Sequence, residues 1–268
     1  MSTYKIEAGT AQHIGSRPQQ NDRVALFTAQ KAPGYVLAVL ADGISGGATG
    51  AEQVLHTAKQ LFDEYRAAES VHLPRLQELL REIANDVHQI LVMDPRTGAS
   101  EPQSSIVLMV LTPERQAAWA IVGDSRLYRF DNKECLARSS DAEYVAHLME
   151  KENLPEEAAR KHRQAKLLSN ALGNKHREPF ITFGVQENLK AGNAFLLCSD
   201  GLWSYFADVE LASAIAKKSP REAAELLINK ARERAQGKGD NCSMAIIKLV
   251  APPKEPVNYT VQKLRKAV

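Results

Sequence analysis

Two apolar segments of this chain end in the same way, and this repeat constrains the fold more than any other feature. Residues 35–41 lead into Asp42 and residues 195–199 lead into Asp200, and a glycine follows each aspartate. A buried strand fixes the backbone beneath a carboxylate at its end, and a following glycine lets an ion or ligand approach the main chain closely. A single Asp-Gly pair is most often an ordinary turn. The repeat instead indicates two strands that present carboxylates at a sheet edge.

Two further aspartates stand beside segments of strand character. Asp124 follows the apolar residues 117–122, and Asp240 precedes the apolar residues 244–250. Carboxylate oxygens are among the ligands that hard divalent cations prefer. We therefore expect these two aspartates and the two Asp-Gly pairs to form a cation site if the fold brings them to one cleft.

The charge and the apolar pattern exclude several classes of protein. The 268 residues carry a net charge of only +2, so there is no general electrostatic attraction to nucleic acid or to a membrane surface. No segment approaches the length of a membrane-spanning helix, and the N-terminus lacks a basic region followed by an apolar stretch. The three cysteines are too scattered for a disulfide framework or a zinc site, and Cys198 and Cys242 lie in apolar runs typical of buried free thiols. These features predict a cytoplasmic protein, and we expect a monomer.

The spacing of apolar residues predicts an α+β fold in which sheets pack together and helices lie outside. Residues 105–130 show three short strand patterns that indicate one meander. Apolar residues recur at helical spacing in 54–65 and 76–91, and Ser219 opens a capping box with Pro220 at the first helical position. The expected strands are residues 4–12, 24–28, 35–41, 105–111, 117–122, 125–130, 180–185, 194–199 and 244–250, and the expected helices begin near residues 51, 76, 209 and 219.

We expect residues 1–250 to form one domain with two distinct additions. The segment 141–172 is polar and charged and has only a weak apolar periodicity, which predicts a surface flap. Residues 251–268 combine three prolines with mixed charges, which predicts a C-terminal tail or a linker.

Five short motifs, in this order along the chain, resemble those of the bacterial PP2C (PPM) metal-dependent protein serine/threonine phosphatases. No single motif is specific, and it is their order that identifies the family. The resemblance runs to about residue 250, and residues 162–173 are also similar to bacterial members. The motifs are Arg17 with Asp22, then Asp42-Gly43, residues 123–126, residues 200–203 and residues 239–241.

The resemblance implies two antiparallel β-sheets packed as a sandwich, with helices on both outer faces and a metal centre at one edge. Asp42 is similar to the aspartate that bridges two Mn²⁺ or Mg²⁺ ions, and Gly43 to the glycine that supplies a backbone carbonyl ligand. Asp200 and Asp240 resemble the remaining carboxylate ligands of one ion. Asp124 matches an aspartate that helps to bind a weaker third ion in bacterial members.

Two more residues take roles in the reaction from the same resemblance. Arg17 resembles the phosphate-binding arginine, and Asp22 a residue that holds metal-bound water. Two divalent ions about 3.5–4 Å apart acidify a shared water and offset the charge of the phosphoryl oxygens. The implied reaction is attack by a metal-bridging hydroxide on phosphoserine or phosphothreonine, and it needs no cysteine or serine nucleophile.

The chain departs from the family pattern at three places. Asn21 stands where the family commonly has glutamate, and residues 44–48 lack the histidine proposed as general acid. The flap begins with residues 140–143, without the common Asp-His-Ser. The leaving group would then be protonated by a metal-bound water or, less simply, by His162 in the flap segment, and the altered flap implies altered substrate selection.

Three functions remain open from the sequence. The first is a cytoplasmic protein phosphatase that acts on phosphorylated proteins and opposes a serine/threonine kinase. The second is a noncatalytic module of the same fold that binds partners, which the missing histidine and glutamate favour and the retained aspartates oppose. The third is a small-molecule phosphomonoesterase, which would share the chemistry and differ only in the walls of the cleft.

Overall fold

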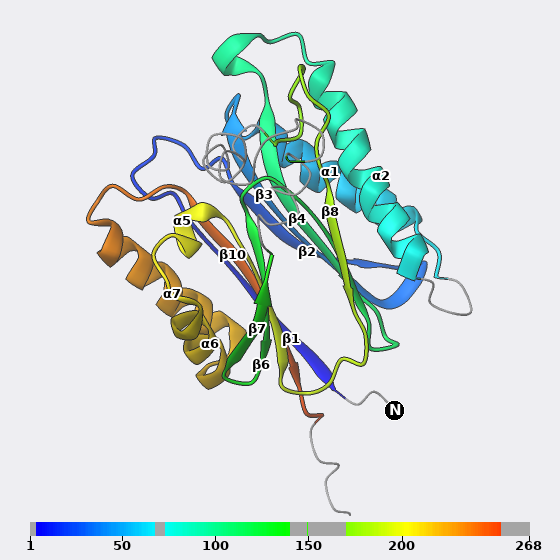
Figure 1. The fold of residues 1–268 in the computed structure, drawn as a ribbon, viewed down its shortest axis with the longest axis vertical. Helices are drawn as coiled ribbons and strands as arrows, with labels where there is room; N and C mark the ends of the chain where they lie inside the picture. The colour runs from blue at the N-terminus through cyan, green and yellow to red at the C-terminus, as the bar shows by residue number, and fades with distance from the viewer. Residues whose placement is uncertain (1–3, 68–72, 140–148, 150–169, 253–268) are drawn as a thin grey trace, which may run out of the picture.

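The computed structural model, which describes residues 4–67, 73–139, 149 and 170–252, shows two five-stranded antiparallel sheets packed face to face (Figure 1). The α+β sandwich expected from the sequence is confirmed. One sheet has the order β1 (Lys5–His13), β10 (Cys242–Val250), β9 (Asn193–Cys198), β6 (Arg126–Asp131) and β7 (Glu134–Arg138). The other has the order β2 (Arg23–Ala29), β3 (Ala32–Ser45), β4 (Gln103–Leu111), β5 (Ala117–Val122) and β8 (Thr182–Gln186).

Helices cover the outer face of each sheet, as Figure 1 shows. The sheet that contains β3 packs against α1 (Thr49–Glu64) and α2 (Leu73–Val92). The sheet that contains β10 packs against α6 (Asp208–Lys217) and α7 (Pro220–Ala235), with the short helix α5 (Asp200–Trp203) at its end. A single 3-10 turn, η1 (Gly98–Ser100), precedes β4. The expected capping box is present, because the Ser219 backbone N–H donates to Glu222 Oε2 at 3.0 Å and the Glu222 backbone N–H donates to Ser219 Oγ at 3.4 Å.

The apolar residues form three layers of core, and this arrangement explains the unbroken apolar run that precedes Asp42. Along β3, Leu37 and Val39 pack under the outer helices, whereas Ala38 and Leu40 pack between the two sheets. Successive side chains of a strand point to opposite faces, and here both faces are buried. A strand buried on both faces has no polar alternation, which is the pattern that the sequence shows.

Residues 105–130 do not form one meander. β4 and β5 pair within one sheet, but β6 belongs to the other, so residues 123–125 cross between the sheets. Gly123 makes this crossing with a φ of +94°, a left-handed backbone conformation that glycine adopts without strain. A short connection between two strands has the same residue pattern whether it closes a hairpin or joins two sheets. The crossing places Asp124 at the end of the sandwich.

Three other features of the chain differ from the sequence expectation. β3 continues past residue 41 to Ser45, because β4 also extends and pairs with it as far as Gln103. Asp200 begins a helix rather than ending a strand, and β7 was not expected because its five residues are partly exposed. Neither α5 nor β7 is long enough to show a clear period.

Most of the expected flap lies outside the described residues, as do His162 and residues 253–268 of the expected tail. Residues 170–172 are described, and for them the prediction of a surface position is wrong. All three are buried, and Leu172 exchanges backbone hydrogen bonds with Ser104 of β4. No helix of the described residues has the length and apolar character needed to cross a membrane.

Candidate active site

The candidate site lies at the end of the sandwich where the β1–β2 and α7–β10 connections run side by side (Figure 1). Asn241 joins the two connections. Its side-chain amide donates to the carbonyl oxygens of Ile14 at 2.7 Å and Gln19 at 3.0 Å, and its Oδ1 accepts from the Asn21 backbone N–H at 2.6 Å. The sequence motif 239–241 drew attention to its aspartate, whereas the structure shows that the asparagine holds the loop that carries Arg17.

One cavity of about 180 Å³ gathers the predicted site residues. Asp22 does not line it and lies buried beneath, with 1% of its surface exposed. The lining residues are Arg17, Asn21, Asp42, Gly43, Ile44, Asp124, Asp200, Asp240 and Asn241. Two contacts bring Asp42 and Asp124 to the same place. Asp42 pairs with Ser105 across β3 and β4, and the Ser105 hydroxyl lies 2.6 Å from the hydroxyl of Ser125, the residue that follows Asp124.

Asp42 and Asp22 form a carboxyl pair in the floor of the site. Each group affects the pKa of the other, and Ser199 Oγ donates to Asp22 Oδ2 at 2.9 Å. Burial, together with the charges of Asp22, Asp200 and Asp124, raises the pKa of Asp42 well above its usual range. Burial also raises the pKa of Asp22. The pair is therefore a costly place for two negative charges.

For the same reasons as for Asp42, the pKa of Asp200 is raised. Burial raises its pKa to about 7, and the charges of Asp124, Asp240 and Asp22 add to that effect. Asp124 is fixed from the other side, since the indole N–H of Trp203 donates to its backbone carbonyl at 3.1 Å. The cluster has more negative charge than the protein itself neutralises.

Among the described residues, Arg17 is the only cation that lines the cavity, and it binds Asp240 with two hydrogen bonds. Arg17 Nε lies 2.7 Å from Asp240 Oδ1, and a terminal nitrogen lies 2.5 Å from Oδ2. The residue expected to bind phosphate therefore holds a carboxylate that was expected to bind a metal ion. Within the part of the chain that the structure describes, no three His, Cys, Asp or Glu side chains are drawn together around one point as a complete ion site would require.

The donor set nevertheless fits Mn²⁺ or Mg²⁺. All its acidic groups are carboxylates, neighbouring carboxylates raise the pKa values of Asp42 and Asp200, and Asn21 Oδ1 is a buried oxygen without a hydrogen-bond donor among the described residues. Hard divalent cations prefer such oxygen ligands and would neutralise the charge. Neither Cys198 nor Cys242 lines the cavity, and both are buried free thiols as expected.

Comparison with known proteins identifies the family. The sequence profile of the family described as protein phosphatase 2C matches residues 9–228. The chain belongs to the protein phosphatase 2C family. It is 27% identical over 219 residues to the serine/threonine protein phosphatase PstP of Mycobacterium tuberculosis, an alignment that covers 81% of this chain and 41% of PstP. The chain thus spans less than half the length of that relative.

Two solved structures of lower sequence identity share the protein phosphatase 2C fold. A serine/threonine phosphatase of S. agalactiae has a TM-score of 0.73 at 21% identity, over 91% of this chain and 99% of the other. The catalytic domain of PstP, solved in complex with two manganese ions, has a TM-score of 0.66 at 21% identity, over 91% of this chain and 98% of the other.

The raised pKa of Asp200 leads to an expected pH dependence for the metal-free protein. A carboxyl group whose pKa rises from 3.8 to about 7 on folding keeps its proton in the folded state where the unfolded chain has lost it. In the presence of a chelator, the free energy of unfolding should therefore fall as the pH rises from about 4 to about 7. The loss from this group should stay below about 4 kcal/mol, because water screens a partly buried side chain.

Urea denaturation of the parent protein and of Asp200→Asn, across this pH range, measures the effect. Burial lowers the pKa values of His13 and His88, which contribute the opposite slope, but they do so in both proteins. The difference between the two curves therefore reports on Asp200 together with the part of the Asp42 shift that the charge of Asp200 causes. Parallel curves would contradict the raised pKa.

Proposed function

We propose that this domain is a metal-dependent phosphatase that hydrolyses phosphoserine and phosphothreonine in proteins. The supporting observation is the shared cavity, in which the carboxyl groups of Asp42, Asp124, Asp200 and Asp240 stand beside Arg17. The carboxylates provide a place for cations, and the arginine provides a planar donor for the oxygens of a phosphoryl group. Family membership supports the same reaction, and phosphorylated proteins, with a serine/threonine kinase to supply them, are the proposed partners.

Four residues would hold two Mn²⁺ or Mg²⁺ ions. These are Asp42, between the ions, Gly43 through its backbone carbonyl, and Asp200 and Asp240 through their side chains. Asp124 would help to hold a weaker third ion. The PstP catalytic domain was solved with two manganese ions, which supports a centre of two ions. When bound, the ions supply positive charge that acidifies water and offsets the charge of the phosphoryl oxygens.

The protein's own groups must rearrange for such binding. A carboxyl ligand has to be deprotonated, so the binding of an ion must overcome the raised pKa of Asp42. Asp240 must separate from Arg17, which frees the guanidinium to grip two phosphoryl oxygens at once. Asp22 stays fixed by Ser199 beneath the cavity, and its proposed role of holding metal-bound water requires that water to reach it through the floor of the site.

Phosphate release from a small aryl phosphate and from phosphothreonine peptides, with Mn²⁺ and with a chelator, tests this proposal. A protein phosphatase should hydrolyse both substrates only with the metal. Binding of phosphopeptides without hydrolysis would favour the noncatalytic module, and hydrolysis of the aryl phosphate alone would favour the small-molecule phosphomonoesterase.

We expect Arg17→Ala to lower kcat/KM by roughly ten- to a hundredfold, because it removes a charge-assisted contact of about 1.5–3 kcal/mol. Arg17→Lys should recover only part of the rate, since an ammonium group cannot bind two oxygens in the same planar geometry. Steady-state kinetics on the aryl phosphate measure this effect. Unchanged kcat/KM in Arg17→Ala would show that the residue is only a surface charge.

A further inference from the structure

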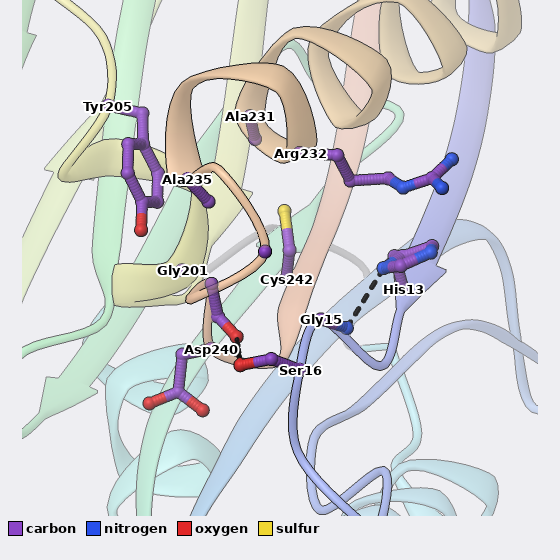
Figure 2. Close-up of a pocket in the computed structure, with 12 residues that line it drawn as sticks. His13, Gly15, Ser16, Gly201, Tyr205, Ala231, Arg232, Ala235, Asp240 and Cys242 are labelled. Carbon is purple, nitrogen blue, oxygen red and sulfur yellow. Dashed lines mark hydrogen bonds between the residues drawn. The ribbon is translucent and has the colours of Figure 1, made fainter.

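A groove runs from the aspartate cavity toward the C-terminal end of α7. Two hollows of about 440 and 220 Å³ form it, and they share the residues around Tyr205 and Gly237. The larger hollow meets the aspartate cavity at Arg17, Asp200 and Asp240. The smaller hollow lies between Tyr205 on one side and Arg232 on the other, as Figure 2 shows. We call this pair of hollows the α7 groove.

Three cationic side chains of the described residues line the α7 groove. With increasing distance from the aspartate cavity, they are Arg17, Lys238 and Arg232. In the described part of the chain, the groove's only acidic lining residues are Asp200 and Asp240, which are already proposed as metal ligands. Arg17 pairs with Asp240, but Lys238 and Arg232 are exposed and have no ion-pair partner among the described residues.

The arginines of α7 that do not line the groove each form an ion pair with a glutamate. Arg221 binds Glu225, and Arg234 binds Glu210. The side chains of Arg232 and His13 lie on the same side of the groove (Figure 2). His13 Nδ1 accepts from the Gly15 backbone N–H at 2.9 Å, so this ring keeps its second nitrogen as a donor. The far end of the groove therefore offers hydrogen-bond donors and positive charge to an occupant.

We propose that the α7 groove binds the substrate chain beside the phosphorylated residue and selects acidic side chains there. This assignment rests on the proposed phosphatase function, because the phosphoryl group in the aspartate cavity fixes where the rest of the substrate lies. The groove is the open continuation of that cavity, and its unpaired cations match aspartate, glutamate or a second phosphorylated residue. Complementary charge of this kind mainly determines specificity and the rate of association.

The test compares three peptides with the same length and a central non-hydrolysable phosphonate analogue of phosphothreonine. Their flanking residues are acidic, neutral or basic, and fluorescence anisotropy with Mn²⁺ measures their Kd. Each exposed charge pair contributes a factor of roughly 1.5–5 in affinity. We expect the parent protein to bind the acidic peptide about tenfold more tightly than the basic one, with a smaller ratio at high salt.

Charge reversal identifies the residues that carry the preference. In Arg232→Glu the ratio of the two affinities should fall by about fivefold, and in the double variant with Lys238→Glu the order should reverse. Lys230→Glu is the matched control, because Lys230 is exposed on the same helix and does not line the groove. It should retain the parent ratio.

Equal affinity of the parent for all three peptides, or an unchanged ratio in the double variant, would overturn the assignment. Loss of the proposed phosphatase function has a different signature. In that case aryl phosphate is not hydrolysed, whereas the order of the peptide affinities still reports on the groove.

Discussion

Asp42→Asn should lower phosphate release by roughly a thousandfold or more, the largest effect that we expect from any conservative change in the site. Asp42 lies on β3 at the centre of the aspartate cavity and is coupled to Asp22, Asp200 and Asp124. It is proposed to lie between both ions, so the amide would weaken both at once. The measurement is phosphate release from an aryl phosphate at saturating Mn²⁺.

A stability measurement separates loss of metal from loss of fold. In chelator, Asp42→Asn should be at least as stable as the parent protein, because the amide carries no charge into a cluster that is already too negative. Mn²⁺ should raise the Tm of the parent but not that of the variant, since only a bound ion stabilises the folded state. Asp86→Asn on the exposed face of α2 is the control and should behave as the parent. Near-normal hydrolysis by Asp42→Asn would refute the metal assignment.

The sequence predicted the two sheets and the metal-type aspartates because both depend on strong local patterns. The strand that carries Asp42 is apolar throughout, and α1 and α2 have buried residues at regular helical spacing. Aspartates beside such elements are therefore easily noticed. The prediction that these aspartates meet in one site came from the order of the family motifs rather than from any local pattern.

Long-range contacts in the site could not be predicted from the sequence. The bond between Arg17 and Asp240 joins residues that are 223 positions apart, and it depends on how two connections meet at the end of the sandwich. The clamp made by Asn241 has the same origin. The α7 groove likewise forms only where the C-terminal end of one helix meets the start of another, so the positions of Lys238 and Arg232 in the sequence give no sign of it.

We expect Gly201→Ala to destabilise the protein, although local propensity predicts the opposite. Gly201 lies in α5, where alanine is a better helix former than glycine by about 1 kcal/mol. A methyl group on Gly201, however, would lie 2.0 Å from the backbone carbonyl oxygen of Asn241. That backbone cannot move away easily, because the Asn241 side chain holds the loop that carries Arg17. We expect a net loss of about 1–3 kcal/mol in the free energy of unfolding.

The same displacement should weaken Mn²⁺ binding, because Asp200 and Asp240 are the immediate neighbours of the two clashing residues and would be pushed apart. Urea denaturation in chelator gives the loss of stability, and the Mn²⁺-induced shift in Tm gives the loss of binding. Gly98→Ala separates a clash from backbone strain: its φ is +62°, but its methyl group would meet no atom within 4 Å. It should cost about 1–2 kcal/mol in stability without changing the Mn²⁺ shift. If Gly201→Ala is instead as stable as the parent and responds equally to Mn²⁺, then α5 and the α7–β10 connection do not approach each other this closely.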